Sequence, residues 1–129
     1  LGGFFIALAM EQWNLHRRIA LSLLNRLGTT PGALIAGFLL VTSLLSMWIS
    51  NTATALMMLP IGMAVLLKIE GEFGTERSAP LSVALMLSIA YGASIGGIAT
   101  LVGTPTNLAF VKIFRETFPS APPISFGSW

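Results

Sequence analysis

SMWISNTATALMMLPI, residues 46–61, places a polar cluster in the middle of a long apolar run. The run extends from Leu27 to Leu67 without a charged residue, and as one straight helix it would measure about 60 Å at about 1.5 Å per residue. Because the hydrocarbon core of a bilayer is about 30 Å thick, the run must fold back on itself. The sequence therefore predicts a helical hairpin over residues 29–70 with its tip at residues 50–54.

A second charge-free run follows, and its most irregular part is YGASIGGIATLVGTPTNLAF, residues 91–110. Pro105 has no amide donor and its ring clashes with the preceding helical turn, so the GTPTN segment should unwind a helix. Unwound backbone inside a membrane is tolerated only where it lines a protein cavity. We expect a discontinuous transmembrane helix over residues 78–118, broken near residues 100–107.

The segments outside these two runs are shorter and more polar. Residues 1–12 are expected to end a transmembrane helix that begins upstream, and residues 13–28 to form an amphipathic helix in the membrane interface. Residues 71–77 form a charged linker, and residues 119–129 a loop leading to the next helix. The arginines of the amphipathic segment favour the cytoplasmic side for that segment and for the linker.

The composition indicates the environment in which these helices fold. Charged residues make up 9% of the chain, against roughly a quarter in a soluble domain. Hydrophobic residues reach 54% and the mean hydropathy is +0.82, more apolar surface than a small soluble domain could hide. The net charge of +2 is small and scattered, so no nucleic-acid partner is expected, and the absence of cysteine excludes disulfides. The expected class is an all-α membrane protein in a lipid bilayer.

The polar groups inside the two runs are neutral hydroxyls and amides. Discontinuous membrane helices direct half-helix N-termini at anions and offer free carbonyl and hydroxyl oxygens to sodium. Neither run contains an acidic or basic side chain, so the chemistry predicts binding and not bond-making. The groups available for it are Ser46, Ser50, Asn51, Thr52, Thr100, Thr104, Thr106 and Asn107.

Simpler interpretations of the same residues remain open at this point. The cluster at 50–54 can be a polar turn between two complete spans, and GTPTN an ordinary proline kink. The small residues Gly92, Gly96 and Ala99 are most simply explained by close helix packing. A structural or channel-type membrane protein is therefore an alternative.

An enzyme is not expected. Read as a phosphate-binding loop, residues 97–104 fail, because the two glycines are one residue too far apart and no lysine follows Gly103. The two runs also lack the acid, base or nucleophile that an embedded enzyme needs.

Residues 46–61 and 91–110 together closely resemble the divalent anion/sodium symporter family, whose members carry dicarboxylates or sulfate. Residues 1–21 and the final ISFGSW are also similar to that family, so the resemblance covers nearly the whole chain. It implies one half of an inverted-repeat elevator transporter, in which a re-entrant helical hairpin and a discontinuous transmembrane helix from each repeat share a midplane site. It also implies a homodimer of the full-length protein.

The resemblance also implies roles for individual residues. One position departs from the family, since relatives often have two prolines where this chain has Pro105-Thr106. The residues implied for the substrate carboxylate are Asn51, Thr52, Thr104 and Pro105, and those implied for sodium are Ser46, Ser50, Asn51 and Gly103.

The expected function is therefore sodium-coupled symport of C4-dicarboxylates such as succinate, with sodium as co-transported ion and no other cofactor. The expected location is the inner membrane of a bacterium, which the protein crosses several times. A carrier of sulfate or another inorganic anion, and a sodium-independent dicarboxylate exchanger, are alternatives within the same superfamily.

Overall fold

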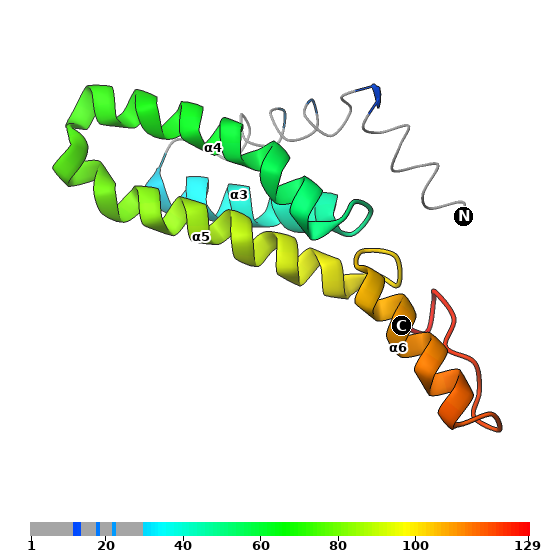
Figure 1. Cartoon of the computed structure of the whole chain (residues 1–129). Coiled ribbons are helices and arrows are strands. Elements are labelled where there is room, and N and C mark those ends of the chain that lie inside the picture. The colour runs from blue at the N-terminus through cyan, green and yellow to red at the C-terminus, as the bar shows by residue number, and fades with distance from the viewer. Residues whose placement is uncertain (1–11, 14–17, 19–21, 23–29) are drawn as a thin grey trace.

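The computed structural model describes residues 12, 13, 18, 22 and 30–129, and the regular structure in residues 30–129 is helical (Figure 1). The amphipathic helix predicted for residues 13–28 and the helix end predicted for residues 1–12 fall almost wholly outside the described residues. The helices are α3 (Pro31–Ser46), α4 (Asn51–Phe73), α5 (Thr75–Ala99) and α6 (Pro105–Thr117).

Helix α3 begins where the sequence supplies a cap. The Thr30 side chain accepts a hydrogen bond from the Ala33 amide at 3.4 Å, and Pro31 occupies the first turn, where its missing N–H costs nothing. The helix has 16 residues and is therefore about 24 Å long, shorter than the hydrocarbon core of a bilayer. Its C-terminal end leads directly into the turn of the hairpin.

The turn lies earlier than the predicted tip at residues 50–54. Residues 47–50 connect α3 to α4, and α4 already begins at Asn51. The reason is local, because the Ser50 side chain accepts a hydrogen bond from the Ala53 amide at 3.3 Å and caps the new helix. Residues 51–54 are therefore the first turn of α4, and their polar side chains lie at its N-terminus.

The charged linker predicted at residues 71–77 is almost entirely helical. Helix α4 continues to Phe73 and α5 begins at Thr75, so Gly74 alone separates them. Its φ of +82° lies in the left-handed region that favours glycine, and its amide donates to the Glu70 carbonyl at 2.9 Å. The other residues of the segment are compatible with a helix, and one glycine is enough to reverse the chain.

Helix α5 packs against both arms of the hairpin (Figure 1). A Cβ on Gly92 would lie 2.7 Å from the Leu39 carbonyl oxygen, and one on Gly96 would meet the Ser43 backbone, so α3 and α5 touch through their backbones. This confirms the close packing predicted from the small residues. The buried core between the three helices consists of Phe38, Val41, Leu45, Met58, Leu66, Leu85 and Ile89.

The outer faces of α4 and α5 are apolar as well. Both helices are long and apolar enough to cross a membrane, yet only 22% of the apolar window in α4 and 39% of that in α5 is buried. Large side chains such as Leu56 and Leu67, each 64% exposed, point away from the core. An apolar surface of this kind supports an integral membrane protein and agrees with the predicted all-α membrane class.

The second interruption separates α5 from α6. Helix α5 ends at Ala99 and α6 begins at Pro105, so the non-helical residues 100–104 lie within the predicted 100–107. After α6, residues 118–129 form no further helix and turn back along it (Figure 1). The Trp129 indole nitrogen donates to the Ile98 carbonyl at 2.8 Å, and its ring packs edge-on against Phe110, with centroids 5.9 Å apart.

Candidate functional site

The two non-helical segments meet. The Thr100 hydroxyl, in the break of the α5–α6 helix, donates to the Met47 carbonyl at the hairpin turn with a separation of 2.6 Å. The same hydroxyl accepts from the Gly103 amide at 3.1 Å, so one side chain organises its own loop and ties it to the hairpin. Figure 1 shows the two loops next to each other at one end of the three-helix layer.

Ser46 forms the buried floor of this junction. Its hydroxyl oxygen lies 2.7 Å from the Ala93 carbonyl oxygen and 2.9 Å from Asn51 Oδ1, and the residue is fully buried. A hydroxyl has one proton, so it donates to only one of these oxygens at a time. Turning the Asn51 carboxamide so that its NH₂ faces Ser46 would satisfy both contacts. Ser46 on α3 therefore has neutral polar partners on both α4 and α5 within hydrogen-bonding distance.

The Asn51 carboxamide packs directly against Gly97. A Cβ at this position would collide with the Asn51 carboxamide, 2.7 Å from its Nδ2 and closer still to Oδ1. Gly103 also approaches closely, because a Cβ there would lie 2.6 Å from the Gly97 carbonyl oxygen and 3.0 Å from the Ser46 carbonyl oxygen. Only glycine lets the hairpin, α5 and the loop approach so closely.

Asn107 bridges the break from the α6 side. Its Nδ2 donates to the Gly97 carbonyl and to the Thr100 carbonyl, both at 2.8 Å, and the residue is 7% exposed. Both partners are carbonyls and can only accept, so the amide nitrogen and not the oxygen must face them. These carbonyls belong to the last turn of α5 and the start of the break, where a helix leaves its carbonyls without intrahelical partners.

Four helix ends meet at the junction. α3 and α5 end there, whereas α4 and α6 begin there, so the partly positive N-terminal ends of two helices lie beside free carbonyls of two others. Among the described residues, no group of three His, Cys, Asp or Glu side chains could hold a metal ion. The junction is thus suited to a carboxylate at the helix N-termini and to a hard monovalent cation at neutral oxygens.

The structure brings some of the predicted site residues together and leaves others at the edge. Ser46, Asn51 and Gly103 lie in the junction, with Asn51 half-buried. Ser50 and Thr52 are exposed at the start of α4, where Ser50 acts as the helix cap. The remaining two residues, Thr104 and Pro105, form the N-terminal end of α6.

Several residues of the junction were not assigned a site role from the sequence. Neither Gly97 nor Met47 was among the predicted site residues, although the Met47 carbonyl receives the Thr100 hydroxyl. The signal for Gly97 and Asn107 was their position on either side of the GTP break. A contact such as that of Trp129 with Ile98 carries no local sequence signal at all.

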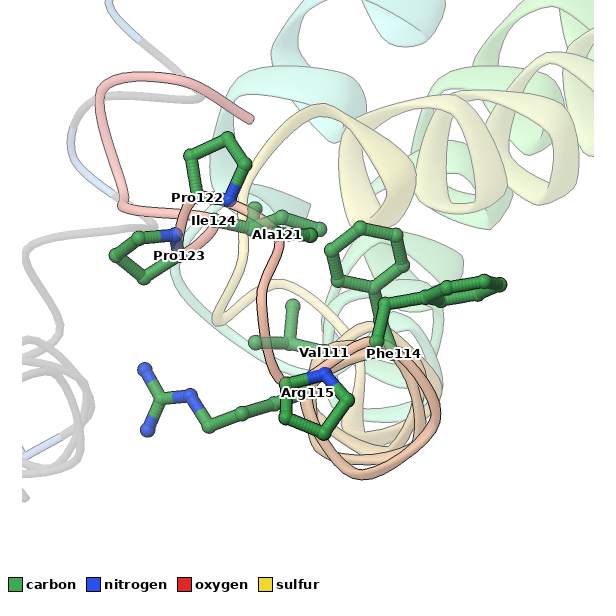
Figure 2. A pocket seen from close by; sticks show the side chains of 9 residues that line it. Val111, Phe114, Arg115, Ala121, Pro122, Pro123 and Ile124 are labelled. Atoms are coloured by element: carbon green, nitrogen blue, oxygen red, sulfur yellow. The ribbon is translucent and has the colours of Figure 1, made fainter.

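A cavity of about 230 Å³ lies elsewhere, between the end of α6 and the proline-rich segment that follows it (Figure 2). None of the junction residues lines it. Its only charged lining side chain is exposed, and it is not the candidate site. The residues around it are Val111, Phe114, Arg115, Phe118, Pro119, Ala121, Pro122, Pro123 and Ile124.

Comparison of the sequence with known proteins identifies related transporters. The sequence matches the profile of a family described as citrate transporters over residues 1–129. It is 41% identical over 133 residues to the sodium-dependent dicarboxylate transporter SdcS of Staphylococcus saprophyticus, covering 100% of this chain and 25% of the relative. It is 39% identical over 171 residues to solute carrier family 13 member 2 of Mus musculus, covering 100% of this chain and 29% of the relative.

The chain therefore spans only about a quarter of the length of the curated relatives it matches. The matched family is one of transporters and not of enzymes. The matches confirm the resemblance to the divalent anion/sodium symporters that the hairpin and the broken helix carried, and the chain belongs to the citrate transporter family.

Proposed function

We propose that the protein carrying this chain is a sodium-coupled symporter of small dicarboxylates, most simply C4 acids such as succinate, and that this chain supplies one half of its binding site. The observation that carries the proposal is the junction of the two helix breaks, joined by the Thr100 hydroxyl and the Met47 carbonyl at 2.6 Å. A hairpin turn and an interrupted helix of an apolar bundle meet at neutral polar groups, which is the arrangement expected of an ion and anion site in a membrane carrier.

The carboxylate of the substrate would bind at the N-terminal ends of α4 and α6. Asn51 and Thr52 begin α4, and Thr104 and Pro105 begin α6, so backbone amides and side-chain donors of both helices are available near one place. The helix dipoles favour negative charge there. No arginine or lysine lies in these turns, so the proposed recognition of the dianion depends on neutral donors.

Sodium would bind on the other side of Asn51, at the oxygens of Ser46 and Asn51, with Ser50 and the Gly103 loop nearby. Hydrogen-bond donors already occupy three carbonyls at the end of α5 and the start of the break, because Asn107 bonds those of Gly97 and Thr100 and Trp129 bonds that of Ile98. The carbonyl ligand for sodium would therefore come from the remaining residues of the break.

The larger assembly is part of the same proposal. A re-entrant hairpin is supported by the length of α3, which at about 24 Å does not cross the hydrocarbon core. Relatives about four times as long leave room for a second, inverted half of the site and for a scaffold. We infer an elevator mechanism and a homodimer in the inner membrane of a bacterium from the family resemblance alone.

The test is uptake of labelled succinate by the full-length protein in proteoliposomes, under an inward gradient of either sodium or potassium. Uptake that requires sodium is the expected result. Uptake in both salts that needs a dicarboxylate loaded inside would identify a sodium-independent exchanger. Sulfate uptake without succinate uptake would identify an inorganic-anion carrier, and either outcome would overturn the proposal.

A further inference from the structure

We propose that Asn107 is a positioning residue that sets the sodium affinity of the junction, a role that rests on the proposed sodium coupling. Asn107 is the residue of α6 that reaches back over the break to α5. Its one amide group holds the carbonyls of Gly97 and Thr100 at 2.8 Å each, three residues apart in the chain. It therefore ties the last turn of α5 and the first residue of the break to α6 with a single side chain.

The bonded carbonyls explain why this side chain acts on the binding groups. Gly97 lies between two asparagines, with Asn107 bonded to its carbonyl and the Asn51 carboxamide packed against its Cα. Thr100 likewise has Asn107 on its carbonyl, while its hydroxyl reaches the Met47 carbonyl of the hairpin. The amide of Asn107 thus bonds the two residues of this region, Gly97 and Thr100, that contact the hairpin through Asn51 and Met47.

Loss of the two donors would leave the buried Gly97 carbonyl unpaired and would leave the Thr100 carbonyl with only the Gly103 amide, at 3.3 Å. Both carbonyls lie in the region where the proposed site takes its backbone oxygens. An unpaired buried acceptor is costly, so the break would relax toward other partners or water. Sodium binds to oxygens whose spacing is fixed by this segment, whereas maximal transport rate depends on the moving assembly as a whole. The half-saturating sodium concentration should therefore change more than the maximal rate.

The experiment measures succinate uptake against sodium concentration for the full-length protein and two variants. Asn107→Leu keeps a similar volume without donors, and Asn107→Gln keeps the amide donors on a longer stem. Asn107→Leu is expected to raise the half-saturating sodium concentration about tenfold or more, and Asn107→Gln clearly less. Thr117→Leu, a loss of a polar side chain at the exposed end of the same helix, should leave the sodium dependence unchanged.

The outcomes separate this inference from the proposed function. Absence of sodium-dependent uptake in the unchanged protein would overturn the proposed function itself. If the unchanged protein takes up succinate normally with sodium while the Leu and Gln variants lose sodium affinity equally, the side-chain volume and not the amide donors sets the affinity. That result would overturn the role of Asn107. For a variant too slow to assay, the same comparison comes from thermal stabilisation of the purified protein by sodium, measured without substrate. An unchanged stabilisation by sodium in Asn107→Leu would also overturn the role of Asn107.

Discussion

At the scale of single residues, Asn51 has contacts with two different parts of the proposed site. Its carboxamide lies 2.9 Å from the Ser46 hydroxyl and packs on Gly97, while its backbone begins α4. Asn51→Ala should lower succinate uptake at least about a hundredfold, because ligands on both sides lose a bonding partner. Uptake in proteoliposomes normalised to the inserted protein measures this loss.

Insertion and folding of the Asn51→Ala variant should be retained, since the hydrophobic arms of the hairpin do not depend on this side chain. Thermal stability and elution of the detergent-solubilised full-length protein provide the check. Near-normal uptake in a well-folded variant would remove Asn51 from the site.

Ser46 offers a narrower test of the cation side. Its hydroxyl lies within hydrogen-bonding distance of the Ala93 carbonyl and of Asn51, and the residue is fully buried. Ser46→Ala should raise the half-saturating sodium concentration several-fold, because one oxygen ligand is lost. The preference between succinate and other dicarboxylates should change little. Ser94→Ala is the matched control, because the exposed Ser94 hydroxyl bonds only its own helix, at the Ala90 carbonyl. An equal effect of both substitutions would contradict the assignment of Ser46.

At the scale of the helices, glycines decide how closely α5 approaches its neighbours. A Cβ at Gly96 would meet the Ser43 backbone, with the carbonyl carbon at 2.7 Å, and backbone cannot move aside cheaply. Gly96→Ala should therefore destabilise the fold by about 1–3 kcal/mol, as overpacking does. Thermal unfolding of the purified full-length protein measures the difference.

Gly62→Ala is the matched change in α4, where that helix packs against α5. There a Cβ would meet the flexible side-chain ends of Leu85 at 3.0 Å, Ile89 at 3.1 Å and Met86 at 3.3 Å. Alanine also favours the helix more than glycine does. Its midpoint of unfolding should stay close to that of the unchanged protein. A Gly62→Ala variant as unstable as Gly96→Ala would show that α4 packs against α5 as rigidly as α3 does.

The presence of the hairpin and of the broken helix could be predicted from the sequence more accurately than the residues at which the helices end. Two charge-free runs longer than the membrane is thick, each with a polar interruption, were enough to predict the hairpin and the broken helix. The hairpin turn was placed a few residues late because Ser50 and the residues after it are equally typical of a loop and of a helix cap followed by a first turn. At 71–77 the charges suggested a linker, but charged residues form helices readily and only Gly74 departs from one.

The contacts between the elements were beyond sequence reasoning. The Thr100 hydroxyl and the Met47 carbonyl are separated by 53 residues, and a periodic pattern gives each helix a face without giving two helices a relative position. The same holds for Ser46 and the Ala93 carbonyl, 47 residues apart. Residue types could therefore be predicted for the site, because neutral oxygens within apolar runs are few, but not the partner of each.

At the scale of the whole molecule, the path of the chain makes a prediction about sidedness. Helix α4 returns from the junction to Gly74, α5 runs from Gly74 back to the junction, and α6 continues beyond it (Figure 1). If the junction lies within the bilayer, Gly74 and the loop after α6 must emerge on opposite sides. The basic residues near the start of the chain favour the cytoplasm for the Gly74 end.

Single cysteines test this path directly, because the chain has none of its own. Glu72→Cys, beside the Gly74 turn, and Ser120→Cys, each in a full-length protein without other cysteines, should react with a membrane-impermeant maleimide from opposite sides. Position 120 should react in intact cells, and position 72 only after lysis. Ser50→Cys, at the hairpin turn, should react far more slowly than either, and more slowly still with sodium and succinate present. Labelling of both the Glu72 and Ser120 variants from one side would mean that α6 does not continue across the bilayer. Rapid labelling at position 50 from the outside would make α3 and α4 two complete spans whose turn lies in water.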